Sequence, residues 1–147
     1  MKKTISLLFF ALFACGVFAQ DNNEAVNTNK WIDTYSSLNA AKDWNGMLSK
    51  LAECRAEVPN WDFADYYEGV ANFNLKNYQK AVDALTSFIQ KNQSTPAAFL
   101  YRGNAYLEMK EPIFAIKDYD EYLKATPNDI PTMLSKAQAR LITKDYA

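Results

Sequence analysis

The sequence predicts an all-α protein built from repeated pairs of antiparallel helices. The first observation is a short triplet that recurs at one fixed interval, beginning at Lys42, Lys76, Lys110 and Lys144. The second is that the apolar residues on both sides of each triplet follow the helical period of about 3.6 residues. Because the interval of about 34 residues is the length of a known class of helical repeat, each repeat is expected to be one helix pair.

Residues 1–19 precede the repeats and have the features of a secretory signal. Two lysines are followed by an almost unbroken apolar run over residues 5–18, and a small residue, Ala19, precedes Gln20. The run is shorter than the span of about 20 residues that crosses a membrane. We therefore expect residues 1–19 to be removed and the remaining chain to be exported to a bacterial periplasm or cell envelope.

A lipid anchor is the alternative at this terminus. The segment LFAC, ending at Cys15, resembles the lipobox of bacterial lipoproteins, whose cysteine is lipidated. Phe13 stands where that motif usually has a small residue, and residues 16–19 are apolar where a lipoprotein has a polar tether. Removal of residues 1–19 is therefore the preferred prediction, and lipidation at Cys15 stays open.

The composition after residue 19 restricts the classes of partner. It has 14 basic and 17 acidic residues, a net charge of −3. It lacks the clusters of lysine and arginine that bind nucleic acid or anionic lipid. Cys54 would be the single cysteine, so no intramolecular disulfide can form. Residues 20–27, QDNNEAVN, are polar and predict a short disordered leader.

Other positions obey the same period and divide the repeat domain over residues 28–147. Identical residues lie one or two periods apart at Pro59 and Pro127, Gly69 and Gly103, and Ala81 and Ala115. The resulting units are three full repeats and a half-repeat, over residues 28–61, 62–95, 96–129 and 130–147.

Within each full repeat, apolar residues at i, i+4 and i+7 predict amphipathic helices. This spacing occurs at Trp31, Tyr35 and Leu38, then at Met47, Leu51 and Cys54, at Ala81, Leu85 and Phe88, and at Ala115, Tyr119 and Tyr122. Pro96 and Pro112 stand where helices should begin, because the first turn of a helix does not need the N–H group that proline lacks. The lysine triplet therefore marks the turn between the two helices of a repeat.

These residues match a known family. The segment YRGNAYLEMKEPIFAIKDYDEYLKATPND resembles the tetratricopeptide repeat in length and at Gly103, Tyr106, Ala115, Tyr119 and Pro127. The resemblance covers three repeats and the final helix. It implies a right-handed superhelix of stacked antiparallel helix pairs, with about three full repeats and a C-terminal capping helix.

Some residues depart from the family pattern. The family usually has glycine at the four turn positions, so lysines in a left-handed conformation there would be strained by about 1 kcal/mol each. Tyr35 and Met47 are bulky where the family prefers small residues, and Asn72 occupies a site that is normally apolar. These departures concern local geometry and leave the predicted architecture unchanged.

The resemblance implies a concave groove, lined mainly by the first helix of each repeat, that binds a protein or peptide. Its positions are Ile32, Phe63, Tyr66, Val70, Phe73, Leu100, Asn104, Leu107, Leu134, Gln138 and Leu141, with Glu108 and Ile142 at further positions. Because apolar anchors carry most of the energy of many interfaces, the candidate anchors are Tyr66, Phe73, Leu100 and Leu107. The competing interpretation is that these side chains only pack the helices together.

The best-known groove of this family grips the C-terminal carboxylate of chaperones with lysine, asparagine and arginine. The matching positions in this chain hold Ile32, Ser36, Tyr67, Ala97 and Tyr101. The resemblance therefore implies a ligand that presents apolar side chains, such as a peptide or a helix, and not a chaperone tail.

The final helix ends the array without a second helix behind it. Lys136 and Arg140 predict a polar outer face, which the end of a repeat array needs in order to stay soluble. Two functions are compatible with this architecture. The first is a protein-binding module of the cell envelope that uses its groove, and the alternative is a structural subunit that assembles through the ends of the array.

An enzyme is not expected. The chain contains no histidine, which excludes histidine-dependent nucleophile pairs and the usual histidine metal sites. Cys54 lies at a predicted core position, and no glycine-rich phosphate loop is present. Asp118, Asp120 and Glu121 are expected to form a solvated acidic face. The sequence thus predicts no catalytic residue, no metal site and no cofactor.

Overall fold

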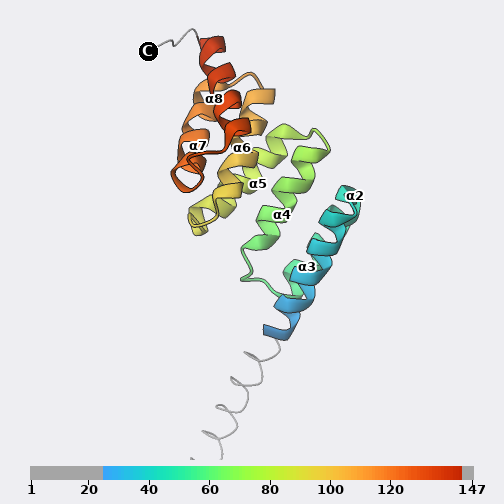
Figure 1. Ribbon diagram of the computed structural model, residues 1–147. Helices are drawn as coiled ribbons and strands as arrows, with labels where there is room; N and C mark the ends of the chain where they lie inside the picture. Colours follow the sequence, from blue (N-terminus) through green and yellow to red (C-terminus); the bar gives the residue numbers. More distant parts are fainter. Residues whose placement is uncertain (1–24, 144–147) are drawn as a thin grey trace, which may run out of the picture.

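The computed structural model describes residues 25–143 as an array of α-helices (Figure 1). The first helix covers residues 25–40. It is followed by α2 (Trp44–Ser49), α3 (Leu51–Glu57), α4 (Phe63–Asn74), α5 (Tyr78–Lys91), α6 (Pro96–Glu108), α7 (Pro112–Ala125) and α8 (Ile130–Thr143). The described residues form no strand, and the predicted all-α fold is confirmed. The predicted signal in residues 1–19 lies outside the described residues.

The helices pack in chain order, so that each contacts the one before it and the one after it. From α4 to α8, every consecutive pair of helices is in contact, and α6 also touches both α4 and α8. Figure 1 shows the array running from the first helix at one end to α8 at the other. The helices α4, α6 and α8 therefore lie next to one another along one side of the array.

The predicted apolar faces form the core. Buried residues include Trp31, Tyr35, Met47, Leu51, Cys54, Ala81, Leu85, Phe88, Ala115 and Tyr119. Two glycines allow the helices of a pair to approach closely: a Cβ atom would lie 2.4 Å from Leu85 Cγ at Gly69, and 3.0 Å from Tyr119 Cε1 at Gly103. In these two pairs, a glycine on the first helix thus receives a large side chain from the second.

The lysine turns have the left-handed backbone expected from the family resemblance. Lys42, Lys76 and Lys110 have φ angles of 56°, 63° and 62°. At the second turn, the Lys76 N–H donates to the Phe73 carbonyl (2.9 Å) and the Asn77 N–H donates to the Asn72 carbonyl (2.8 Å). This pair of bonds is the Schellman motif, in which glycine normally provides the left-handed residue. The turn at Lys144 lies outside the described residues.

Replacement of Lys76 by glycine should therefore raise the free energy of unfolding by about 1 kcal/mol, because glycine adopts positive φ without a clash of its Cβ. Urea denaturation measures the change. Lys76→Ala is the control, since it removes the amine and keeps the Cβ, and it should give no gain. An equal gain in both variants would assign the effect to the lysine side chain and not to the backbone.

The first helix pair differs from the expected pattern in its bounds and from the later pairs in its packing. Its second helix is divided into α2 and α3 at Lys50, whose N–H donates to the Met47 carbonyl at 3.3 Å. Its first helix includes residues 25–27, which the sequence placed in the leader; neither proline nor glycine interrupts residues 25–40. Tyr35 occupies the position of Gly69 and Gly103 and is fully buried, with its ring stacked on Tyr67 at 4.8 Å.

Candidate functional site

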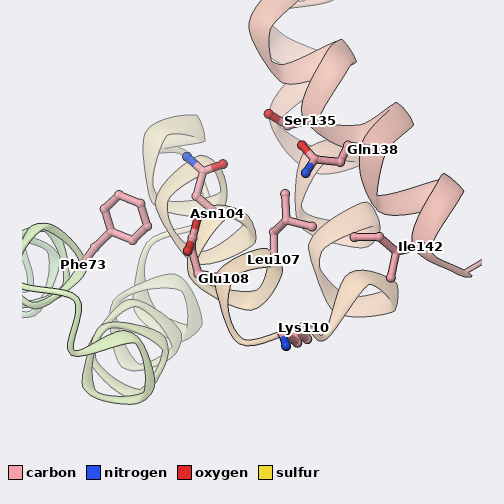
Figure 2. A pocket seen from close by; sticks show the side chains of 8 residues that line it. All are labelled: Phe73, Asn104, Leu107, Glu108, Lys110, Ser135, Gln138 and Ile142. Atoms are coloured by element: carbon pink, nitrogen blue, oxygen red, sulfur yellow. The ribbon is translucent and has the colours of Figure 1, made fainter.

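A pocket of about 430 Å³ opens on the side of the array formed by α4, α6 and α8. We call it the α6–α8 pocket, and it is lined by Phe73, Asn104, Leu107, Glu108, Lys110, Ser135, Gln138 and Ile142 (Figure 2). In Figure 2, side chains of α6 and α8 face each other across the opening, and Phe73 stands at its α4 side. The pocket combines three apolar side chains with polar side chains that can donate or accept hydrogen bonds.

Four of the eleven predicted groove residues meet in this pocket, and they are Phe73, Asn104, Leu107 and Gln138. Glu108 and Ile142, which the resemblance placed at further groove positions, also line it. Lys110 and Ser135 complete the lining and were absent from the predicted set. Ser135, Gln138 and Ile142 follow a helical i, i+3, i+7 spacing, and this is the signal that could have identified Ser135.

The other predicted groove residues lie elsewhere. Val70 is buried, with 2% of its surface exposed, so it is part of the core and offers no surface to a ligand. Phe63 and Tyr66 pack against the cluster of Leu85, Phe88, Ile89 and Ala98. Leu100 is half-buried and does not line the pocket, while Ile32, Leu134 and Leu141 are exposed outside it.

Tyr66 shows why an aromatic residue in this array need not be a ligand contact. Its ring lies 5.4 Å from Tyr67, 5.4 Å from Phe88 and 6.4 Å from Tyr101, measured between centroids. Burial raises the pKa of Tyr66 to about 12. These contacts join three helices, so Tyr66 takes part in helix packing, and its role as an anchor stays a prediction.

Asn104 is oriented by a buried residue behind the pocket. The Tyr119 hydroxyl donates to Asn104 Oδ1 at 2.8 Å, and Tyr119 itself is fully buried in α7. Burial raises the pKa of Tyr119 to about 12, so its hydroxyl keeps its proton at neutral pH. Because the amide oxygen is engaged by this bond, the Asn104 NH₂ group is the part that can donate to a ligand.

The rim of the pocket carries one acid and one base. Glu108 ends α6 and Lys110 occupies the left-handed turn that follows it. Among residues 25–143, neither side chain takes part in an ion pair. The Tyr78 hydroxyl approaches Glu108 Oε2 at 3.4 Å. Both charges are exposed and can interact with a bound chain.

The predicted acidic face of α7 is solvated at Asp120 and Glu121, whose side chains are 46% and 45% exposed, but the prediction was wrong for Asp118. Asp118 is 4% exposed and accepts two hydrogen bonds from Arg102, at 2.8 Å from Nε and 2.7 Å from Nη2. Arg102 Nη1 also donates to Thr86 Oγ1 at 3.1 Å. Burial raises the pKa of the Asp118 carboxyl, and the facing guanidinium opposes that shift. This ion pair fastens α6 to α7.

The outer side of α8 also differs from the prediction. Lys136 turns back to α7, where it forms an ion pair with Asp120, and so does not contribute to a polar outer face. Instead Ile130, Leu134 and Leu141 are 66%, 65% and 60% exposed. The described part of the array therefore ends in an apolar helix face flanked by Arg140.

The other group that the sequence analysis considered for chemistry is the thiol of Cys54. Cys54 is fully buried, as predicted, and burial raises the pKa of its thiol. Within residues 25–143, no group of three or more cysteine, aspartate or glutamate side chains could hold a metal ion.

None of the helices in this range is long and apolar enough to cross a membrane.

Comparison with known proteins supports the repeat fold. No family model matches the sequence. The chain is 33% identical over 111 residues to human Tetratricopeptide repeat protein 21B, a match that covers 74% of this chain and 8% of that protein. It is also 33% identical over 82 residues to mouse Neutrophil cytosol factor 2, covering 56% of this chain and 15% of that protein. The chain thus matches only a small part of each relative's length.

Solved structures resemble the array over most of its length. The first TPR of Spaghetti (RPAP3), bound to the HSP90 peptide SRMEEVD, has a TM-score of 0.70 and 17% identity, covering 84% of this chain and 94% of that one. MamA protein has a TM-score of 0.66 and 26% identity, covering 88% of this chain and 68% of that one. The chain therefore has a fold like that of tetratricopeptide-repeat proteins.

Proposed function

We propose that this chain is a protein-interaction module that binds an apolar peptide or helix in the α6–α8 pocket. The observation that carries the proposal is the pocket itself. It places Phe73, Leu107 and Ile142 beside the amide groups of Asn104 and Gln138. Apolar side chains of a ligand would contact the first three residues, and the amides would bond its backbone. We propose no catalytic role.

The chemistry of the lining favours a ligand other than an acidic tail. The RPAP3 domain was solved with the peptide SRMEEVD, but its low identity to this chain supports only the shared fold. Among the described residues that line the α6–α8 pocket, Lys110 is the one cation, and Glu108 lies beside it on the rim. Since this acid would repel a C-terminal carboxylate, we infer a ligand that inserts apolar side chains.

The proposed place of action is the bacterial periplasm or cell envelope. Support comes from the basic, apolar and small-residue pattern of residues 1–19, which is typical of a secretory signal. Lipidation at Cys15 is the alternative. Mass determination of the N-terminal peptide from the exported protein separates the two, because a chain processed after Ala19 begins at Gln20 and carries no acyl group.

The ligand can be captured through the pocket. A photo-crosslinking amino acid at Gln138, which is exposed at the pocket, should trap a partner peptide. The same amino acid at Ile113, which is 61% exposed on α7, is the control and should not trap it. The trapped segment is then synthesised and its affinity measured by fluorescence anisotropy.

Leu107→Glu should weaken binding of that peptide by tenfold or more, about 1.4 kcal/mol, because it places a charge among the apolar contacts. Ile113→Glu introduces the same charge outside the pocket and should retain the affinity of the parent. Circular dichroism confirms that both variants are folded. If Leu107→Glu binds the peptide as tightly as the parent does, the ligand does not occupy the α6–α8 pocket.

A second candidate function is assembly through the end of the array. The exposed apolar side chains Ile130, Leu134 and Leu141 on the outer side of α8 favour it. They lie outside the α6–α8 pocket, so the two functions use different surfaces and can be tested separately.

A further inference from the structure

We propose that the outer face of α8 binds α8 of a second copy of this chain, in an antiparallel arrangement around a twofold axis. This inference deepens the second candidate function, since it names the subunit that the array end accepts. The surface involved is a stripe formed by Ile130, Leu134, Ala137 and Leu141, which we call the α8 stripe.

The α8 stripe lies on the side of the helix opposite its packed face. Thr132 and Ala139 are 2% and 0% exposed and face the rest of the array, whereas the three large residues of the stripe are at least 60% exposed. Met133, at 49% exposed, flanks the stripe. Aliphatic side chains exposed side by side along a helix are typical of an interaction surface.

A cavity lies at the edge of the α8 stripe, between α8 and α7. Ala137 lies one period after Gly103 and two periods after Gly69, which receive Tyr119 and Leu85 from the following helix. At Ala137 no described helix provides such a side chain. A cavity of about 220 Å³ remains instead, lined by Leu123, Met133, Lys136, Ala137 and Arg140.

The spacing of the stripe allows α8 to pair with α8 of a second copy. The intervals between stripe residues are four, three and four, and this order reads the same in both directions. In an antiparallel pair, Ile130 therefore faces the second copy's Leu141, and Leu134 faces its Ala137. Leu134 meets a small residue, as in knobs-into-holes packing, while Ile130 and Leu141 form an apolar pair at each end. The contact is isologous, as a twofold dimer requires.

The charges select the antiparallel direction. Arg140 flanks the stripe near its C-terminal end and has no ion-pair partner among residues 25–143. A parallel pair would place two Arg140 side chains next to each other, which is repulsive. The antiparallel pair separates them and brings each one towards Asp129 at the start of the other α8, where opposite charges attract.

Sedimentation velocity of the full chain in the micromolar range tests the proposal, with three proteins that share the same N-terminal segment. The parent and Ile113→Glu should shift from one chain to two as concentration rises. Leu134→Glu should stay at one chain, because it places a charge in the centre of the contact. A parent that stays at one chain, or a Leu134→Glu variant that associates like the parent, would overturn the proposal.

A mixing experiment tests the direction of pairing. Leu134→Glu and Ala137→Lys should each be monomeric alone, and an equimolar mixture should form a dimer, because Glu at 134 then faces Lys at 137 of the other chain. In a parallel pair these charges would not meet, so a mixture that stays monomeric contradicts the antiparallel arrangement. Peptide binding in the α6–α8 pocket and dimer formation can be distinguished with two variants. Leu134→Glu should still bind the peptide, and Leu107→Glu should still form the dimer.

Discussion

Replacement of Tyr119 by alanine should lower the free energy of unfolding by about 3–5 kcal/mol, the usual cost of removing a fully buried aromatic side chain. The ring fills the space that Gly103 leaves between α6 and α7, with its Cε1 atom 3.0 Å from the position of a Cβ there. Its removal opens a cavity at the centre of this helix pair. Urea denaturation followed by circular dichroism measures the loss.

Tyr119→Phe separates the ring from the hydroxyl. Phenylalanine keeps the packing and removes the bond to Asn104 Oδ1, so stability should fall by only about 1 kcal/mol. Affinity for a peptide bound in the α6–α8 pocket should nevertheless fall, because Asn104 would lose its fixed orientation. A loss of stability as large as that of Tyr119→Ala would show that the hydroxyl, and not the ring, provides most of the stabilisation.

Replacement of Asp118 by alanine should lower the free energy of unfolding by a similar amount, about 3–5 kcal/mol. The substitution leaves the guanidinium of Arg102 without its carboxylate partner at a buried site. The side chains of Arg102 and Asp118 are 15% and 6% exposed, so water replaces little of the lost interaction. The same denaturation experiment measures this change.

The double variant Arg102→Met with Asp118→Leu is the matched control. It removes both charges and fills their space with apolar groups, and such replacements of buried ion pairs often restore stability. We expect the double variant to be more stable than Asp118→Ala by several kcal/mol. If both proteins are equally destabilised, lost packing and not the unpaired charge is the cause.

Much of the fold could be predicted because the sequence repeats its own signals. The recurring lysine at 42, 76 and 110 located three turns, and its left-handed backbone followed from the glycine that the family has there. The i, i+4, i+7 spacing identified the buried faces. The division of the second helix at Lys50 was not predictable in this way, because the apolar spacing from Met47 to Cys54 continues through it.

The burial of Asp118 was missed because the acidic residues were considered on their own helix only. Its partner, Arg102, precedes it along the chain by the same separation that joins Gly69 to Leu85 and Gly103 to Tyr119. Residues at this separation face each other across a helix pair. A search for opposite charges at this separation would therefore have identified the ion pair from the sequence.

The candidate site was predicted only in part, for a related reason. The repeat position places Phe73, Asn104, Leu107 and Gln138 on one side of the array, and the structure brings them together. The same positions in the middle of the array are covered by neighbouring aromatic rings, as at Tyr66. Repeat position fixes the direction of a side chain, whereas the size of its neighbours decides whether a ligand can reach it.

The most direct test of the proposed function is a nuclear magnetic resonance titration of the full chain with the peptide trapped through Gln138. The side-chain amide signals of Asn104 and Gln138 should shift together as peptide is added, while that of Gln90, which is exposed on α5, should stay in place. Shifts confined to residues outside the α6–α8 pocket, with Asn104 and Gln138 unchanged, would contradict the assignment of this pocket as the binding site.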